Sequence, residues 1–149
     1  MKSKLIYDGP QKTFALVFEK GDELVQGLTG FVKERSLNAS HFTAIGAFNS
    51  AVLGFFDREE KDYKRIPIRE HVEVLSLVGD VALRGREPQL HAHVVVGKAD
   101  GTAHSGHILQ AYVWPTLEVV LTESPDYLCR ATDDETGLGL IDLSDVKSG

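Results

Sequence analysis

The chain has little cysteine and no long apolar run, and both shortages narrow the class of protein it can be. Its single cysteine, Cys129, cannot form an internal disulfide, which is compatible with a reducing compartment. No apolar stretch approaches the roughly 20 residues needed to cross a bilayer. The first ten residues lack the apolar core of a secretory signal. We therefore expect a soluble, cytoplasmic protein with no membrane partner.

The chain is also short of positive charge. It has 16 lysines and arginines against 22 aspartates and glutamates, a formal net charge of -6. A nucleic-acid-binding domain normally needs a basic face to contact phosphates. The segment Arg84-Gly85-Arg86 is similar to the core of a minor-groove-binding hook, but Glu87 stands where a proline would follow. An acidic residue beside phosphates opposes binding, so we do not expect DNA binding by this chain alone.

What the chain does contain is enough apolar sequence for one folded domain. Hydrophobic residues make up 42% of its 149 residues and charged residues 26%, with no internal repeat or linker. We predict a single domain over 1–149, with its core at about 13–143. The N-terminal arm, 1–10, and the C-terminal tail, 144–149, are polar.

Apolar spacing predicts one principal helix and many strands. Residues at three- and four-residue spacing favour an amphipathic helix at about 22–35, with Asp22 as its N-cap. Apolar runs elsewhere predict strands, with turns at Asn49-Ser50 and Gly79-Asp80. One early helix followed by many strands predicts an α+β fold with a mainly antiparallel sheet.

Histidines concentrate in one short stretch. Four of the six lie between positions 91 and 107, and His91 and His93 form a His-x-His pair. On a strand, such a pair points both rings to one face, because side chains alternate with period two. A third imidazole brought back by a hairpin would complete the three-nitrogen set found at catalytic zinc sites, which leave a fourth position open.

The register of that hairpin decides whether His107 joins the pair. A two-residue loop at Asp100-Gly101 would place the rings of His91 and His93 on the face away from His107. A loop with one extra residue would set His93 opposite His107, with all three rings together. His104 would then point the other way. We therefore predict a metal site at His91, His93 and His107, against the simpler interpretation that these are ordinary partly buried strand histidines.

The remaining reactive side chains are weaker candidates. His41 and His71 are isolated in the sequence, and a structural or surface role suits them better. Cys129 lies in a strand-like context that favours an inert buried thiol over a nucleophile. Glu73 and Glu118 sit in apolar strands, where the solvated face is their ordinary place. A carboxylate facing the histidines would instead act as a general base or orient a ligand imidazole, so both remain catalytic candidates.

A family resemblance joins these observations. The chain resembles the plants and prokaryotes conserved (PPC) domain from about Thr13 to Leu143. The motifs that carry the resemblance are Gly21-Asp22-Glu23-Leu24, Ile45-Gly46-Ala47-Phe48, Glu73-Val74-Leu75-Ser76-Leu77-Val78-Gly79, Pro88-x-Leu90-His91-Ala92-His93, Asp100-Gly101 and Ser105-Gly106-His107-Ile108-Leu109. The resemblance implies a compact α+β domain with a strongly bent, mainly antiparallel sheet, assembled as a homotrimer. It implies zinc at the motif positions of His91, His93 and His107, and a fold similar to that of acetolactate decarboxylase.

The chain also departs from its plant relatives. In plants the domain is attached to AT-hook segments that bind DNA, whereas this sequence has no AT-hook and looks like the bare prokaryotic type. Ser105-Gly106 replaces the family's usual paired glycines before the third histidine. Our leading hypothesis is a homotrimer with a metal site for zinc or another divalent transition metal, able to take a small-molecule ligand. The alternatives are a DNA-associated or transcription-associated protein, a zinc-dependent lyase or hydrolase-like enzyme acting on a small carbonyl substrate, and a module that only trimerises.

Overall fold

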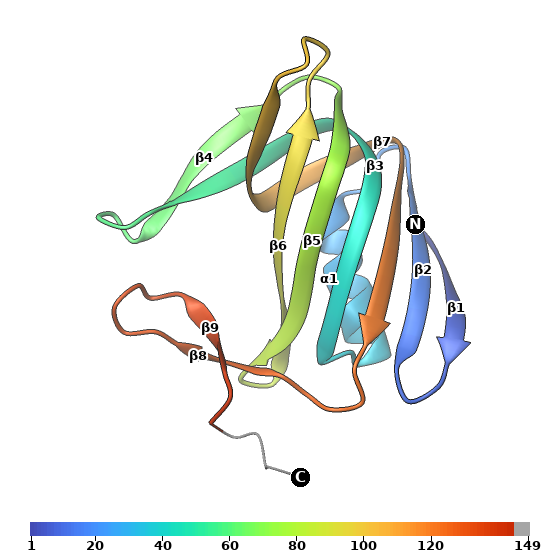
Figure 1. Cartoon of the computed structure of the whole chain (residues 1–149), viewed down its shortest axis with the longest axis vertical. Coiled ribbons are helices and arrows are strands. Elements are labelled where there is room, and N and C mark those ends of the chain that lie inside the picture. Colours follow the sequence, from blue (N-terminus) through green and yellow to red (C-terminus); the bar gives the residue numbers. More distant parts are fainter. Residues whose placement is uncertain (145–149) are drawn as a thin grey trace.

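A computed structural model of the chain describes residues 1–144 and contains one helix among nine strands (Figure 1). In chain order the elements are β1 (Lys2–Asp8), β2 (Lys12–Glu19), α1 (Leu24–Arg35), β3 (Ala39–Asp57), β4 (Asp62–Ile68), β5 (Val72–Arg84), β6 (Glu87–Gly97), β7 (Ala103–Glu123), β8 (Cys129–Thr132) and β9 (Gly139–Asp142). The described helix is too short to span a membrane.

All nine strands belong to one sheet. The strand order is β1-β2-β7-β3-β5-β8-β9, with β4 paired to β3 and β6 paired to both β5 and β7. Every pairing is antiparallel except the single bridge between Leu83 of β5 and Cys129 of β8. The sheet curls so that β4 and the β8–β9 hairpin project on the same side (Figure 1). The predicted α+β class with a bent, mainly antiparallel sheet is confirmed.

Helix α1 covers one face of this sheet (Figure 1). Its buried side chains join the core formed by alternate residues of the strands beneath it: Leu24, Leu28, Phe31 and Val32. The N-cap lies one residue later than predicted: it is Glu23, whose side chain accepts a hydrogen bond from the Gln26 amide at 2.6 Å. The predicted cap, Asp22, instead accepts from the Glu19 amide at 2.8 Å.

Two predicted turns are wrong, and both lie inside long strands. Asn49 and Ser50 belong to β3, which bends through register shifts near Gly46 and Phe48. Ser50 pairs with Tyr112 of β7, while the pairing on the other edge passes from β5 at Phe48 to β4 at Ala51. Gly79 and Asp80 lie within β5, where Gly79 pairs with Phe42 on one side and Ala92 on the other. The sheet requires glycine at 79 because neighbouring atoms crowd the position where a side chain would begin.

The sequence prediction missed several strands near the ends of the chain and at the margins of the sheet. The polar N-terminal arm contains an exposed edge strand, β1, which pairs with β2 along its length. Strands β4 and β9 were not foreseen, and both lie at the margins of the sheet. Most of the predicted tail, 145–149, lies outside the described residues.

We expect Gly79→Ala to destabilise the protein by about 2 kcal/mol, the range seen for overpacking in a tight interior. A Cβ there would lie 2.6 Å from the His91 carbonyl oxygen and 2.8 Å from the Ala92 Cβ. Urea unfolding at fixed protein concentration measures the change. Gly30→Ala in α1 is the matched control, since its Cβ meets nothing within 4 Å. The control should stabilise the helix by about 0.5–1 kcal/mol, and equal effects of the two variants would refute the packing argument.

Candidate metal centre

The hairpin between β6 and β7 has the longer of the two loops considered from the sequence. Gly97 pairs with Ala103, and the Lys98 amide donates to the Thr102 carbonyl at 2.9 Å, which leaves residues 99–101 as the loop. Gly101 adopts φ +82°, a left-handed conformation that favours glycine. The Asp100 carboxylate accepts from the Thr102 amide at 2.9 Å and from its hydroxyl at 2.6 Å. This loop sets His93 directly opposite His107, as the three-residue alternative predicted.

The alternation of β6 then turns the histidines away from the core. Ala92, Val94 and Val96 are buried in the cluster that packs under α1. His91 and His93 occupy the intervening positions, so their rings lie on the face opposite the helix.

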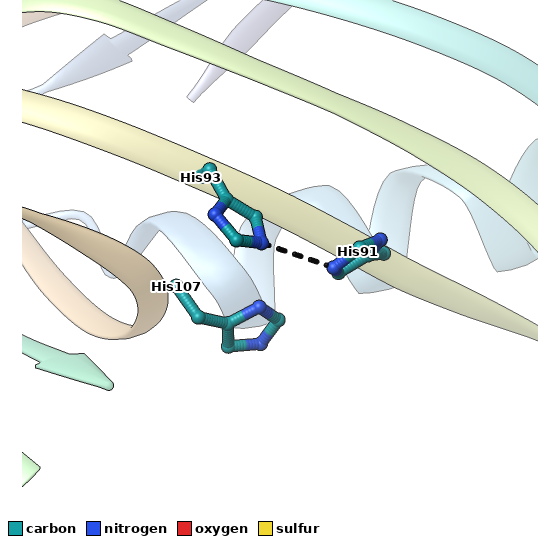
Figure 2. A group of neighbouring side chains, drawn as sticks. All are labelled: His91, His93 and His107. Carbon is teal, nitrogen blue, oxygen red and sulfur yellow. Dashed lines mark hydrogen bonds between the residues drawn. The ribbon is translucent and has the colours of Figure 1, made fainter. Parts of the chain in front are cut away.

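Three imidazole rings meet on that face (Figure 2). His91, His93 and His107 each offer a nitrogen, and these nitrogens all lie within 4.8 Å of one another. The ring centroids are 5.1 Å apart for His91 and His93, 5.3 Å for His91 and His107, and 5.5 Å for His93 and His107. The structure therefore brings together the three histidines that the sequence pattern selected.

The spacing of the nitrogens of His91 and His93 fits a tetrahedral metal ion. Zinc binds imidazole nitrogen at about 2.0–2.1 Å, which sets two ligand nitrogens about 3.3 Å apart in a tetrahedral site. The two Nε2 atoms of His91 and His93 are 3.2 Å apart. The Nδ1 atom of His107 is buried and has no hydrogen-bond partner among the described residues. Buried nitrogens are rarely left unpaired, so a ligand role gives this atom the partner it lacks.

A carboxylate stands behind His91, and it is neither of the two glutamates considered from the sequence. Asp80 lies opposite His91 in the register of β5 and β6, with its Oδ2 3.8 Å from the His91 Nδ1. The buried Arg130 guanidinium forms an ion pair with Asp80 and donates to the Gly139 carbonyl at 2.9 Å. A carboxylate in this position fixes the orientation of a metal-binding imidazole.

The sequence prediction missed Asp80 because it placed residues 79–80 in a turn. The available signal was Gly85-Arg86, which forms a tight turn with Arg84 paired to Glu87. Counting outward from that pair brings position 80 opposite position 91.

Burial sets the protonation of the cluster. Burial, followed by smaller contributions from the charges of His91 and His93, lowers the pKa of His107 from 6.5 to about 4. Burial and then the charge of His91 also lower the pKa of His93. Burial alone would raise the pKa of Asp80, but contact with His91 and the Arg130 charge outweigh it and hold that pKa below its usual range. The imidazoles of His93 and His107 are therefore neutral, as metal ligands must be, at physiological pH.

The walls of the site come from segments distant in sequence. The ring of Tyr63, from β4, stacks on His107 with the centroids 4.7 Å apart, and burial raises the pKa of its hydroxyl. Leu138, between β8 and β9, also lines the site. Two cavities of about 470 Å³ and 720 Å³ open beside His91 and His107. The histidines thus face space for a small molecule.

The two candidate glutamates lie elsewhere. Glu73 is exposed and pairs with Ala47 and Gly97, near the far end of the β6–β7 hairpin. Glu118 is exposed and pairs with residues 17 and 45. Neither lines the two cavities at the histidines, and both occupy the solvated face that was their simpler interpretation.

The other singled-out residues also lie outside the cluster. His104 pairs with Val96, three positions before His107 on β7. His41 is exposed on β3, and His71 packs edge-on against Trp114 at 5.1 Å. Cys129 is a half-buried free thiol at the start of β8.

Comparison with known proteins agrees with this fold. The sequence matches the Plants and Prokaryotes Conserved (PCC) domain over residues 6–125. A metal-containing protein from Archaeoglobus fulgidus is 36% identical, with a TM-score of 0.81 over 95% of this chain and 99% of that chain. A plant- and prokaryote-conserved protein from Pyrococcus horikoshii is 29% identical, with a TM-score of 0.82 over 95% and 94%.

Two further solved structures differ in what they are described to be. A "putative DNA binding protein" from Bacteroides thetaiotaomicron is 26% identical, with a TM-score of 0.84 over 94% of this chain and 96% of that chain. A Staphylococcus aureus protein similar to alpha-acetolactate decarboxylase is 13% identical, with a TM-score of 0.52 over 72% and 50%. The latter likeness shows a related fold alone. No curated protein matches the chain.

We expect the metal-free protein to lose stability as pH falls from about 6.5 towards 4. In that window the unfolded chain binds a proton at position 107, whereas the folded chain, with a His107 pKa of about 4, does not. A pKa unit is worth about 1.4 kcal/mol, and solvent screens the half-buried ring, so we expect a loss of about 1 kcal/mol between pH 7 and pH 5. Urea unfolding in the presence of a chelator measures it. His107→Asn should flatten this dependence and His104→Asn should leave it unchanged; identical slopes in all three proteins would contradict the assignment.

Proposed function

This chain belongs to the Plants and Prokaryotes Conserved domain family, and we propose that it is a cytoplasmic, homotrimeric metal-binding member. The metal is zinc or another divalent transition metal, and its ligands are His91, His93 and His107. The observation that carries this proposal is the convergence of the three imidazole nitrogens within 4.8 Å on one face of the β6–β7 hairpin. The metal-containing relative from Archaeoglobus fulgidus supports it.

Asp80 and Arg130, which lie behind His91, support the assignment of the histidines as metal ligands. For Nε2 to bind a metal, the Nδ1 atom of His91 must carry the proton, and that atom faces the Asp80 carboxylate at 3.8 Å. Arg130 holds the carboxylate in place from a side chain that is 4% exposed. Such an arrangement stabilises the tautomer that a metal requires.

Three protein ligands leave a coordination position for a small molecule. A zinc ion held in this way polarises a carbonyl group or lowers the pKa of bound water to about 7. The two cavities at the site favour small-molecule binding and, as a second candidate function, lyase or hydrolase-like chemistry on a small carbonyl substrate. In that case the hydroxyl of Tyr63, whose ring stacks on His107, would be the proton donor, while Asp80 stays paired with Arg130 and orients His91.

The outer face of the sheet supports self-association. Large apolar side chains are exposed beside the histidines, with Phe55 66% exposed, Val78 51% and Val95 37%. Contiguous exposed apolar surface of this kind indicates an interface, and closed cyclic symmetry satisfies it with copies of the same chain. The family resemblance favours a trimer for that assembly.

DNA binding is not the function that these features favour. The net charge is -6, and the Arg84-Gly85-Arg86 segment forms a tight turn rather than an extended arm. We expect no duplex binding at physiological ionic strength, where a specific site would require several phosphate contacts.

We expect the purified protein, stripped and reloaded, to bind a single zinc ion per chain, and His107→Ala to weaken zinc binding by more than about 100-fold, because it removes a ligand. Elemental analysis gives the stoichiometry, and competition with a chromophoric chelator gives the affinity. Asp80→Asn, which keeps all three ligands, should weaken binding by about tenfold.

His104→Ala is the matched control, since it removes an imidazole from the same strand without touching the cluster. It should bind zinc like the unaltered protein. Full zinc occupancy in the His107→Ala variant would reject the proposed ligand set.

We expect light scattering to give the mass of three chains at micromolar concentration. Phe55→Glu should shift the mass towards one chain, because a charge at this exposed apolar position opposes its burial between copies. Lys61→Gln, in the turn after β3, makes the same change of one negative unit and controls for charge alone. A monomeric unaltered protein would contradict the trimer.

A further inference from the structure

A cavity of about 470 Å³ lies between β6 and the β8–β9 hairpin and reaches His91 and His107. Its polar walls are Asp80, Arg84, Gln89 and Arg130, and its apolar walls include Leu90, Leu138 and Ile141. We propose that this cavity binds a small organic carboxylate with a hydrogen-bond donor beside the carboxylate and an apolar body. The inference deepens the proposed metal site by naming the class of ligand that it receives. It rests on that site only for the additional affinity that a bound metal ion gives to the carboxylate.

The first support comes from polar atoms without partners. Among the described residues, three buried side-chain nitrogen or oxygen atoms have no hydrogen-bond partner: Gln89 Oε1, His107 Nδ1 and Arg130 Nε. His107 Nδ1 is assigned to the metal ion, which leaves Gln89 Oε1 and Arg130 Nε, and both of these residues line this one cavity. Buried polar groups in folded proteins are nearly always paired. Their concentration at one place indicates that the partner is a bound molecule and not the chain itself.

The second support is uncompensated positive charge. Two guanidinium groups line the cavity, and only that of Arg130 has a carboxylate partner, Asp80. Arg84 donates to the Thr132 hydroxyl at 3.0 Å and has no carboxylate within ion-pair distance among the described residues. The wall therefore carries one net positive charge beside apolar surface, which suits a monoanion with an apolar body.

Glycine at position 139 leaves room where Arg84, Gln89 and Arg130 meet. A Cβ built on Gly139 would lie 3.1 Å from Gln89 Oε1, and 3.7 Å from both Arg130 Cδ and Arg84 Nη1. Any larger residue would occupy the point between the two arginines and the amide. Glycine at this position keeps the donors and the acceptor within reach of one small ligand.

The chemistry of the groups selects the ligand. Planar guanidinium groups match the two oxygens of a carboxylate. A doubly charged phosphate would leave a negative charge uncompensated near Asp80, which favours a carboxylate over a phosphate. Gln89 Oε1 can only accept a hydrogen bond, so the ligand must offer a hydroxyl or an N–H next to its anionic group.

Three related probes separate these contributions. Mandelate carries the carboxylate, a neighbouring hydroxyl and a phenyl ring; mandelamide lacks the charge, and phenylacetate lacks the hydroxyl. We expect calorimetric titration of the metal-free protein to give mandelate an affinity roughly tenfold above that of each of the other two. Zinc loading should strengthen mandelate binding further and change mandelamide little, because the metal adds positive charge beside the cavity. Inorganic phosphate should bind more weakly than mandelate.

Two arginines of the same tight turn provide a matched pair of variants. Arg84→Gln should reduce mandelate affinity roughly tenfold and leave mandelamide unchanged. Arg86→Gln removes the same charge at a position that does not line this cavity and should have no effect. Gln89→Leu should lower mandelate affinity to that of phenylacetate. Circular dichroism checks that each variant is folded, and the comparison of probes on the unaltered protein tests the ligand class even if a variant is not.

The outcomes distinguish the two proposals. Zinc binding without discrimination between mandelate and mandelamide, or tighter binding of phosphate, overturns the carboxylate cavity and leaves the metal site standing. Mandelate binding that depends on Arg84 but not on Arg86, in a protein that binds no zinc, supports the cavity and rejects the metal site. Equal loss in the two arginine variants would show a general charge effect and would overturn the cavity.

Discussion

The register between β6 and β7 is the constraint on which the rest of the site depends. Side chains alternate along a strand, so a shift by one residue would move His107 to the helix-covered face and break the cluster. The three-residue loop at 99–101 fixes that register through Gly101 and through the Asp100 carboxylate, which bonds twice to Thr102. Burial of Val94 and Val96 under α1 fixes which face of β6 points to the core, because turning β6 over would expose both valines and bury His93. The same contacts thus hold the fold and place the proposed metal ligands.

The residues around this hairpin come from two parts of the chain: the span that matches the family and the β8–β9 hairpin beyond it. The three histidines and Asp80 lie within residues 6–125, the span that the family shares. Arg130 and Gly139, which hold Asp80 and open the carboxylate cavity, lie beyond it on the β8–β9 hairpin. The proposed metal ligands therefore belong to the common core, whereas the proposed carboxylate cavity combines Arg84 and Gln89 of the core with Arg130 and Gly139 of the peripheral hairpin. A peripheral hairpin can change without disturbing the core, which gives one fold a route to several ligands.

Elements held by local interactions were predictable from the sequence, and elements held by contacts distant in the sequence were not. The helix at 24–35 was predictable because its apolar period and its ends are local, although Glu23 and not Asp22 caps it. The turns at residues 49–50 and 79–80 were wrong because polar and glycine residues usually mark turns. Here β7 pairs with Ser50, and β3 and β6 pair with residues 79–80 from both sides, which keeps the chain extended. Strands β4 and β9 lie half-exposed at the margins of the sheet and therefore carry little apolar pattern. Their local sequences did not predict strands.

By itself the sequence determined which side chains are available: three histidines at a spacing that two strands of a hairpin can bring together, a single helix and a mainly antiparallel sheet. It left two registers open at 99–101, and the one-residue difference between them separates a metal site from scattered imidazoles. Only the tertiary structure decided that register, and only it brought Asp80, Arg130 and Tyr63 to the histidines from three other strands. The physical reason is that composition and spacing act along the chain, whereas the outer layer of the site forms across strand pairs whose partners the sequence does not name.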